Sequence, residues 1–485
     1  MPLPPDGDPG TPAPHATRGP ALTPLAGGTE GPRQLRPLLD TVLEALATGA
    51  TARGGPIPAG GPEAVGHRLR VAAEPLIPEA GIGPHAALRA VVGALAEGAA
   101  DPADPLCAAH LHCPPLAVAT AADLAASALN PSMDSWDQAP AASVLEDLVS
   151  RGLATEVYPE GPAPDALVTT GGTESNQLAV LIARELAKDR GPLQIVCGAN
   201  AHHSVRRAAW LLGLPEPVVL PTPAGVLSPA GLDQALTDVR GPLLAVATAG
   251  TTDTGEIDPL PQLADVCAAH ATRLHVDAAY GAPLLFSRTL AGRLDGLSRA
   301  DSVTLDLHKL GWQPVPAGLL AVPDTTALET LGHREDYLNP PDDTEAGFPD
   351  LLGRSIRTTR RPDVVKVAVT LRALGRTGLA ELVEHTCAAA QRLADLVDAH
   401  PAFDAYERPT LSTVLFRPAG ATDEHVGAVR RALMTEGRAV LGRARATDHR
   451  DGIEKLWLKA TVLNPHTRPA DLEALLEIVE GSAAK

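Results

Sequence analysis

The chain has 485 residues, of which 45% are hydrophobic, so it is long enough to bury more than one core. Its formal net charge of −18 at pH 7 disfavours nucleic acid and anionic membrane surfaces as partners. No apolar run reaches the length of a transmembrane helix, and the first residues lack the basic and apolar regions of a signal peptide. We therefore expect a soluble cytoplasmic protein without nucleic-acid or membrane partners.

The five cysteines are scattered along the chain and odd in number, which favours reduced thiols over a disulfide framework. Two cysteines and two histidines gather between residues 107 and 113. Their spacing does not match a standard zinc site, and no second ligand pair follows at a suitable distance. We therefore expect no bound metal.

The N-terminal part is predicted to hold a tail followed by helices. Residues 1–34 are rich in Pro, Gly, Ala and Thr and show no hydrophobic period, which is typical of a disordered tail. From about Leu35 to Gly49, apolar residues recur at helical spacing, and a second helical pattern lies near residues 85–99. We assign residues 35–128 to an N-terminal helical segment.

From about residue 140 to residue 320, helical stretches alternate with short apolar runs. These runs are ALVTT, QIVCG, PVVLP, LLAVATA, RLHVDA and SVTLD. The alternation predicts an α/β domain with a mainly parallel sheet, which we assign to residues 129–365. In such sheets ligands bind at the carboxyl ends of the strands, and the polar motifs of this chain fall there.

A long helical pattern follows residue 361 and leads into the C-terminal part of the chain. After it, the runs STVLFRP and KLWLKATVL alternate with the helical patterns DEHVGAVRRALMTEG and PADLEALLEIVEG. This pattern predicts a smaller α+β domain over residues 366–485.

A glycine pair follows the first predicted strand of the sheet. Gly171 and Gly172 precede a helix that opens at Thr173 or Glu174. Backbone N–H groups at such a helix start can bind a phosphate, and the glycines permit its close approach. The alternative is an ordinary strand-to-helix turn with Thr173 as the N-cap.

Two further polar motifs follow later strands. His202 could stack on a flat ring or act as an acid or base, although a surface histidine is the alternative. Thr251 and Thr252 could donate hydrogen bonds to an oxygen of a ligand. A plain polar loop explains these two threonines equally well.

The last two polar motifs at strand ends contain an aspartate and a lysine. Asp277 closes the run RLHVD, and Lys309 follows His308 shortly after the run SVTLD. A pyridoxal phosphate enzyme needs a lysine that holds the aldehyde as a Schiff base and a carboxylate that keeps the pyridine nitrogen protonated. A buried Asp277 needs a partner if it is ionised, and either a pyridinium N–H or a structural salt bridge would serve.

The order of the motifs GGTESN, AHHSV, GTTDTGEIDP, HVDAAYG and DSVTLDLHK resembles the pyridoxal phosphate-dependent group II amino-acid decarboxylases. The resemblance runs from about residue 100 to the C-terminus. Within the family, AAHLHCP, SMDSWDQ, HKLGWQP, REDYLN and SIRTTRRPDVVK are most similar to the L-2,4-diaminobutyrate decarboxylases and the siderophore-pathway lysine/ornithine decarboxylases. The resemblance implies the aspartate aminotransferase-like fold, PLP fold type I, with pyridoxal 5'-phosphate as the cofactor.

The resemblance also implies roles for individual residues. Lys309 would hold the cofactor, Asp277 would pair with its pyridine nitrogen, and Ala279 would lie against its ring. His202 would stack on the face of the cofactor, near the carboxylate that leaves. The remaining cofactor-binding positions are Gly172, Thr173, Thr251, Ser302 and His308.

Tyr337, in REDYLN, matches a tyrosine on a mobile loop that returns a proton to Cα after carbon dioxide leaves. In the family this loop reaches the active site of the partner subunit, so the resemblance implies a homodimer with its active site at the subunit interface. The alternative for Tyr337 is a loop aromatic that packs on a neighbour.

We therefore expect a decarboxylase that converts an L-amino acid to its amine and carbon dioxide. The first choice of substrate is a short diamino acid such as L-2,4-diaminobutyrate, followed by lysine or ornithine. Aromatic or acidic amino acids are alternatives, as is a decarboxylation-coupled oxidative deaminase, which the presence of Tyr337 disfavours. A non-catalytic binding subunit of the same fold is the alternative of another class, and the retained Lys309 and Asp277 argue against it.

Overall fold

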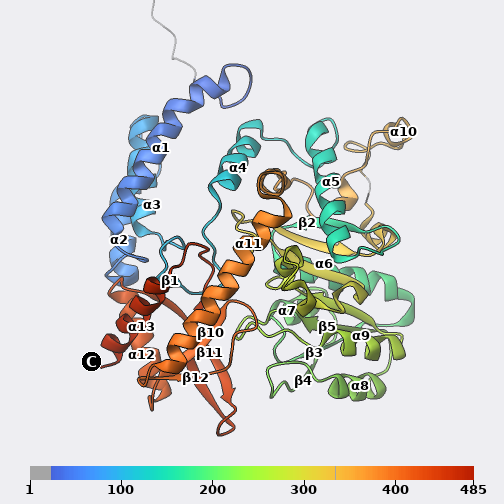
Figure 1. The fold of residues 1–485 in the computed structure, drawn as a ribbon. Helices are drawn as coiled ribbons and strands as arrows, with labels where there is room; N and C mark the ends of the chain where they lie inside the picture. Colours follow the sequence, from blue (N-terminus) through green and yellow to red (C-terminus); the bar gives the residue numbers. More distant parts are fainter. Residues whose placement is uncertain (1–22, 334, 485) are drawn as a thin grey trace, which may run out of the picture.

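The structure is a computed structural model, and it describes residues 23–333 and 335–484. The predicted tail lies outside the described residues up to residue 22, and a helix begins inside its expected range, at Gly31. Three helices, α1 (Gly31–Arg53), α2 (Gly61–Ala73) and α3 (Pro84–Gly98), stand together as an arm at one side of the molecule (Figure 1). No helix in the described part of the chain is long and apolar enough to cross a membrane.

A seven-stranded sheet forms the centre of the larger domain, with the strand order β2-β8-β7-β6-β5-β3-β4. Its strands are β2 (Asp165–Thr169), β3 (Gln194–Gly198), β4 (Val218–Leu220), β5 (Leu243–Thr248), β6 (Arg273–Asp277), β7 (Ser302–Asp306) and β8 (Gly318–Val322). Strands β3 to β7 pair in parallel, whereas β8 runs antiparallel to both β2 and β7. The mainly parallel sheet is confirmed, and β8 is a strand that the sequence pattern did not reveal.

Helices cover both faces of this sheet, which explains why its strands are apolar along their whole length. In β2, Ala166 and Val168 pack into one core and Leu167 packs into another, because successive side chains of a strand point to opposite faces. The covering helices are α5 (Pro140–Val157), α6 (Gly172–Ala187), α7 (Ser204–Leu211), α8 (Pro229–Asp238) and α9 (Leu260–Ala269).

A second sheet of five strands, in the order β1-β11-β12-β10-β9, forms the smaller domain. Its strands are β1 (Cys107–Ala108), β9 (Phe403–Ala405), β10 (Thr413–Pro418), β11 (Val440–Asp448) and β12 (Ile453–Thr461), and α12 (Asp423–Thr435) and α13 (Pro469–Ala483) pack on it. Strand β1 pairs in parallel with β11. Because of this pairing, the residues that directly follow β1, near residue 110, lie between the two sheets.

Helix α11 (Val364–Ala399) runs along both domains (Figure 1). It is interrupted at Gly375, whose φ of 60° is an angle that glycine adopts without a steric penalty. The expected boundary between residues 365 and 366 falls in the first turn of this helix. The four segments 1–34, 35–128, 129–365 and 366–485 remain our proposal for the domain division. The shorter helices α4 (Ala117–Leu129) and α10 (Pro341–Glu345) complete the set.

Candidate active site

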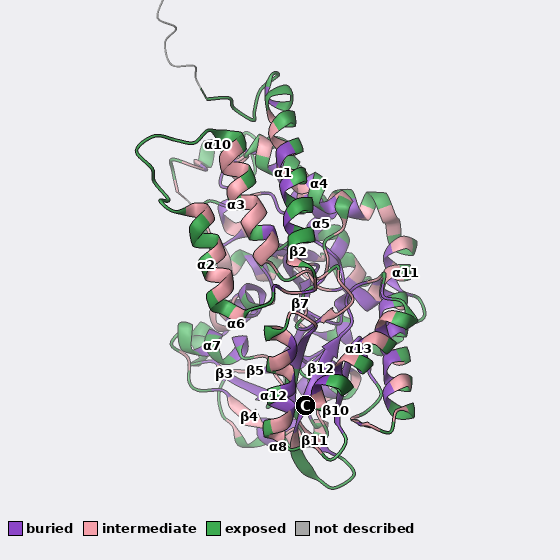
Figure 2. Cartoon of the chain, turned by 90° about the vertical axis from the view of Figure 1, so that its left-hand side faces the viewer, coloured by how far each residue is buried: buried purple, intermediate pink, exposed green. Residues whose placement is uncertain are grey.

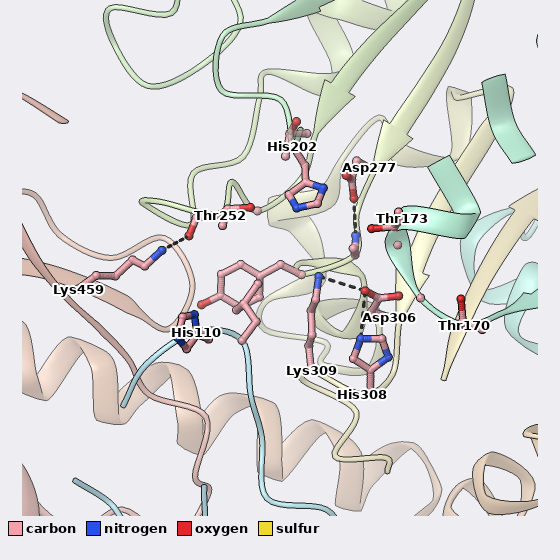
Figure 3. Close-up of a pocket in the computed structure, with 17 residues that line it drawn as sticks. His110, Thr170, Thr173, His202, Thr252, Asp277, Asp306, His308, Lys309 and Lys459 are labelled. Atoms are coloured by element: carbon pink, nitrogen blue, oxygen red, sulfur yellow. Dashed lines mark hydrogen bonds and ion pairs between the residues drawn. The ribbon is translucent and has the colours of Figure 1, made fainter. Parts of the chain in front are cut away.

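A cavity of about 380 Å³ opens where β5, β6 and β7 of the large sheet end and the small domain approaches (Figure 3). Seven of the ten residues expected in the site line it. They are Gly172, Thr173, His202, Asp277, Ala279, His308 and Lys309. The parallel strands bring these residues together from distant parts of the chain, as the strand-end rule predicts.

Lys309 lies in the turn that follows β7, and its Nζ is 3.1 Å from Oδ2 of Asp306. His308 is held beside it, because its Nδ1 accepts the backbone N–H of Ala317 at 3.3 Å. The hydrogen of the neutral ring is therefore on Nε2, which lies 3.5 Å from Oδ2 of Asp306. Burial lowers the pKa of His308, which keeps the ring neutral.

Asp277 is the last residue of β6 and is buried. Its Oδ2 accepts a hydrogen bond from Nδ2 of Asn176 at 2.7 Å, and its Oδ1 accepts the backbone N–H of Ala279 at 3.1 Å. These two bonds stabilise a carboxylate that has little access to water. They also hold it at the wall of the cavity (Figure 3).

His202 follows β3 and also lines the cavity. Its Nδ1 lies 2.8 Å from the hydroxyl of Ser204, and its ring centroid lies 4.0 Å from that of His203. Burial is the largest influence on His202 and lowers its pKa. The ring is therefore neutral at pH 7, which suits stacking on a flat ligand.

The glycine turn after β2 packs closely against the ends of two other strands. A Cβ atom on Gly172 would lie 3.1 Å from Cβ of Ala279, and one on Gly171 would lie 2.9 Å from Cε1 of His308. Helix α6 begins at Gly172, so Gly171 is the N-cap and the proposed alternative, Thr173 as N-cap, is wrong. Gly171, Gly172 and Thr173 at the start of α6 line the cavity, and the first backbone N–H groups of a helix have no partner within the helix.

Three of the expected site residues do not line the cavity. The hydroxyl of Thr251 bonds to Thr254 at 2.8 Å and accepts the N–H of Glu256, while its neighbour Thr252 reaches the cavity instead. Ser302 is the first residue of β7, at the end of the strand opposite the cavity. Tyr337 lies on the surface of its own chain, where 77% of it is exposed.

Other lining residues were not among those expected in the site. They include His110, Thr170, Thr248, Tyr280, Asp306 and Lys459. Asp306 ends the strand that precedes Lys309, so the strand-end rule applied to that run could have found it. His110 and Lys459 come from the side of the small domain, and Nζ of Lys459 donates to the carbonyl of Thr252 at 2.9 Å. No local pattern in the sequence indicates their position.

The cysteine–histidine cluster of residues 107–113 does not gather around one point. His110 lines the cavity, whereas the Sγ of Cys113 lies 3.3 Å from the carbonyl of His308. Within residues 23–333 and 335–484, no group of three or more His, Cys, Asp or Glu side chains is arranged to hold a metal ion.

The residues present fit pyridoxal phosphate. The cavity falls in the size range of small-molecule sites and combines an accessible amine, a buried carboxylate and a glycine turn at a helix start. Two buried atoms on its wall, Oγ1 of Thr248 and Oδ1 of Asp306, have no hydrogen-bond partner among the described residues. Buried polar atoms of this kind normally have a partner, which a bound ligand or its water would supply.

The chain matches the family model described as the pyridoxal-dependent decarboxylase conserved domain over residues 91–419. It is 39% identical to an L-2,4-diaminobutyrate decarboxylase of Rhizobium meliloti (strain 1021), over 84% of this chain and 83% of the relative. It is also 30% identical to an L-2,4-diaminobutyrate decarboxylase of Acinetobacter baumannii, over 78% and 79% of the two chains.

Two solved structures are also similar to this chain. The glutamate decarboxylase domain of diaminobutyrate-pyruvate transaminase and L-2,4-diaminobutyrate decarboxylase from Vibrio parahaemolyticus superposes with a TM-score of 0.83 at 31% identity, covering 95% of this chain and 98% of that one. The Oryza sativa TDC with PLP and tryptamine has a TM-score of 0.84 at 22% identity, covering 96% and 99%, and supports the fold. The expected fold, cofactor and enzyme class are confirmed, and the chain belongs to the group II pyridoxal phosphate-dependent amino-acid decarboxylases.

Proposed function

We propose that this decarboxylase acts on L-2,4-diaminobutyrate and releases 1,3-diaminopropane and carbon dioxide. The observation that carries the proposal is the similarity to two L-2,4-diaminobutyrate decarboxylases, each over more than three quarters of this chain. A structural relative whose description includes the same activity supports it independently.

We propose that Lys309 binds the aldehyde of the cofactor and that Asp277 pairs with its pyridine nitrogen. The support is their position on one cavity, with Asp277 held by Asn176 in a fixed orientation. When bound, pyridoxal phosphate supplies the electron sink for the bond to the departing carboxylate. Asp277 keeps a proton at the pyridine nitrogen, and Ala279 lies on the wall where the ring would rest.

The phosphate would be bound by the backbone at Gly172 and Thr173, with the neutral ring of His308 beside it. The support is the close packing of the glycine turn against His308, which brings the start of α6 to the same wall. Ser302 and Thr251 are better assigned to indirect roles, because neither lines the cavity. Thr251 orders the loop that presents Thr252, and Ser302 contacts a buried histidine at 2.9 Å.

The proton that replaces the carboxylate at Cα is proposed to come from the Tyr337 hydroxyl of a second copy of the chain. Tyr337 is exposed and absent from the cavity of its own chain, as this role requires. The arm of α1, α2 and α3 also supports a homodimer, since much of it is exposed or half-buried (Figure 2) and its exposed residues include large apolar side chains. These side chains are Leu43, Leu46, Leu69, Val71, Val91 and Leu95.

The test is a panel of L-amino acids incubated with the cofactor-loaded enzyme, followed by identification of the amines. The panel contains 2,4-diaminobutyrate, ornithine, lysine, glutamate and an aromatic amino acid. We expect 1,3-diaminopropane to form with the highest kcat/KM. A higher kcat/KM for any other member would overturn the proposed substrate, and an aldehyde product in place of the amine would overturn simple decarboxylation.

A further inference from the structure

A buried asparagine next to the cavity, Asn176, uses all of its hydrogen-bonding capacity. It lies in the first turns of α6 and has no exposed surface. Its Nδ2 donates one hydrogen bond to Oδ2 of Asp277 at 2.7 Å and another to the hydroxyl of Ser204 at 2.8 Å. A primary amide has two hydrogens to donate, and both are used here.

The oxygen of the same amide is also fully engaged. Oδ1 of Asn176 accepts the hydroxyl of Thr304 at 2.7 Å and lies 3.0 Å from Nε2 of His275. The amide cannot be turned around, because its oxygen would then face the carboxylate of Asp277, which only accepts hydrogen bonds. The Asp277 carboxylate therefore identifies which end of the Asn176 amide is the nitrogen and which is the oxygen.

His275 supports this orientation from the far side. It is fully buried, and burial lowers its pKa to about 4, so the ring is neutral near pH 7. The hydrogen of the ring is on Nε2, where it donates to Asn176, and Nδ1 accepts the hydroxyl of Ser302 at 2.9 Å. This contact is the indirect role of Ser302.

Ser204 passes the constraint to His202. Its oxygen accepts from Asn176 and also lies 2.8 Å from Nδ1 of His202. The backbone N–H of Ser204 approaches the same nitrogen at 3.4 Å. Nδ1 therefore acts only as an acceptor, and the hydrogen of the neutral ring belongs on Nε2.

We propose that Asn176 is a positioning residue that orients Asp277 and, through Ser204, holds His202 as the tautomer with its hydrogen on Nε2. The Asn176 amide thereby links Asp277, which would lie at the edge of the cofactor ring, to His202, which would lie on its face. The role of Asn176 rests on the proposed function of Asp277 and His202. It assigns Nε2–H of His202 as a neutral donor available to the substrate carboxylate.

The first test is the tautomer of His202 in the cofactor-free protein. ¹⁵N NMR of histidine-labelled protein at pH 8 distinguishes ring nitrogens that carry hydrogen from those that do not, and His202→Gln identifies the signals. We expect hydrogen on Nε2 in the wild type. In Ser204→Ala and Asn176→Ala, the ratio of the two tautomers should shift by about fivefold, the effect of losing one hydrogen bond. Hydrogen on Nδ1 in the wild type, or an unchanged ratio in both variants, would overturn the proposal.

The second test is the dissociation constant of pyridoxal phosphate, measured by its absorbance change on binding. Asn176→Ala should weaken binding by about tenfold or more, because it removes a hydrogen bond to a charged group. Ser204→Ala keeps the bond to Asp277 and releases only the ring of His202, so its dissociation constant should rise by no more than about fivefold, less than in Asn176→Ala. Equal weakening in the two variants, or none in Asn176→Ala, would contradict a direct role in orienting Asp277.

The matched control is Asn464→Ala, which removes a nearly buried asparagine of the small domain. Its amide donates to the carbonyl of Ala103 at 2.7 Å and has no contact with the cavity. Neither readout should change by more than about twofold in this variant, because no hydrogen bond near the cavity is lost. A change as large as in Asn176→Ala would mean that loss of any buried amide suffices, and the proposal would fail. Because the tautomer is read without turnover, this outcome is independent of which amino acid the enzyme decarboxylates.

Discussion

Nζ of Lys309 lies 3.1 Å from Oδ2 of Asp306, so the proposed cofactor lysine forms an ion pair with the last residue of the strand before it. The pair holds the amine at the cavity wall, where 18% of the lysine side chain is exposed. The lysine is therefore both restrained and accessible, and it has to leave Asp306 to attach to a cofactor.

Lys309→Ala should abolish covalent attachment of the cofactor, because no other amine is expected to replace it. Borohydride reduction followed by peptide mass analysis should label the Lys309 peptide in the wild type and leave the variant unlabelled. Decarboxylation should fall below detection. A label on a peptide that contains Lys459 instead would show that the other lysine of the cavity is the attachment site.

Asp277→Asn should lower kcat by about 10²–10⁴-fold, the range expected for a lost acid–base contribution. The amide has nearly the same shape but cannot keep the pyridine nitrogen protonated as a carboxylate does. Borohydride labelling of Lys309 should persist, which separates lost chemistry from lost attachment. Asp165→Asn is the control, since Asp165 is equally buried but pairs with Arg354 away from the cavity. A kcat near the wild-type value in Asp277→Asn would contradict the role of the carboxylate.

Tyr337→Phe should reduce amine formation by about 10²–10⁴-fold, because the proposed proton donor for Cα is removed. Aldehyde formation, measured in the same reactions, should rise relative to the amine. An unchanged kcat with no aldehyde would place the proton donor elsewhere.

Co-expression of Lys309→Ala and Tyr337→Phe chains tests whether Tyr337 acts on the partner subunit. In a mixed dimer, one site would then combine Lys309 of one chain with Tyr337 of the other. Random pairing makes about half of the dimers mixed, and one of the two equivalent sites in each mixed dimer is complete. About a quarter of the wild-type activity should therefore be restored. Activity no higher than that of the two variants assayed alone would mean that the tyrosine acts within its own chain or not at all.

The stability of the fold should decrease in acid because of His275. Burial lowers its pKa from 6.5 in the unfolded chain to about 4 in the folded one, so the unfolded chain binds a proton first as the pH falls. The contribution is fully present above pH 6.5 and should be lost progressively toward pH 4, by up to about 3 kcal/mol. Urea midpoints between pH 7.5 and 4.5 measure it. The pH dependence should be shallower in His275→Gln, and an identical slope would contradict the assignment.

Arg360 and Glu146 form a buried bidentate ion pair, with N–O distances of 2.6 and 2.7 Å. Arg360→Met should destabilise the fold by about 3–5 kcal/mol, because it leaves the Glu146 carboxylate buried without a partner. The double variant with Glu146→Leu should recover much of the loss. Urea midpoints of the three proteins provide the measurement, and a double variant less stable than Arg360→Met would contradict this account.

The sequence by itself determined the groups that close the strands of the large sheet. Asp277 ends a run that reads as a strand, and His202 and Lys309 each follow such a run, while parallel strands bring their carboxyl ends to one edge. Their presence on one cavity was therefore predictable from local patterns. The family resemblance identified the cofactor as pyridoxal phosphate, and the amine of Lys309 and the carboxylate of Asp277 are groups that this cofactor needs.

Only the tertiary structure decided which other residues join them. His110 and Lys459 reach the cavity because β1 pairs with β11 and β12 lies beside β11, and pairing between distant segments leaves no trace in local periodicity. Ser302 begins β7, at the end of the strand away from the cavity, and the chain order alone did not show that it contacts His275. The four hydrogen bonds of Asn176 join segments more than twenty residues apart, so their convergence required the folded chain.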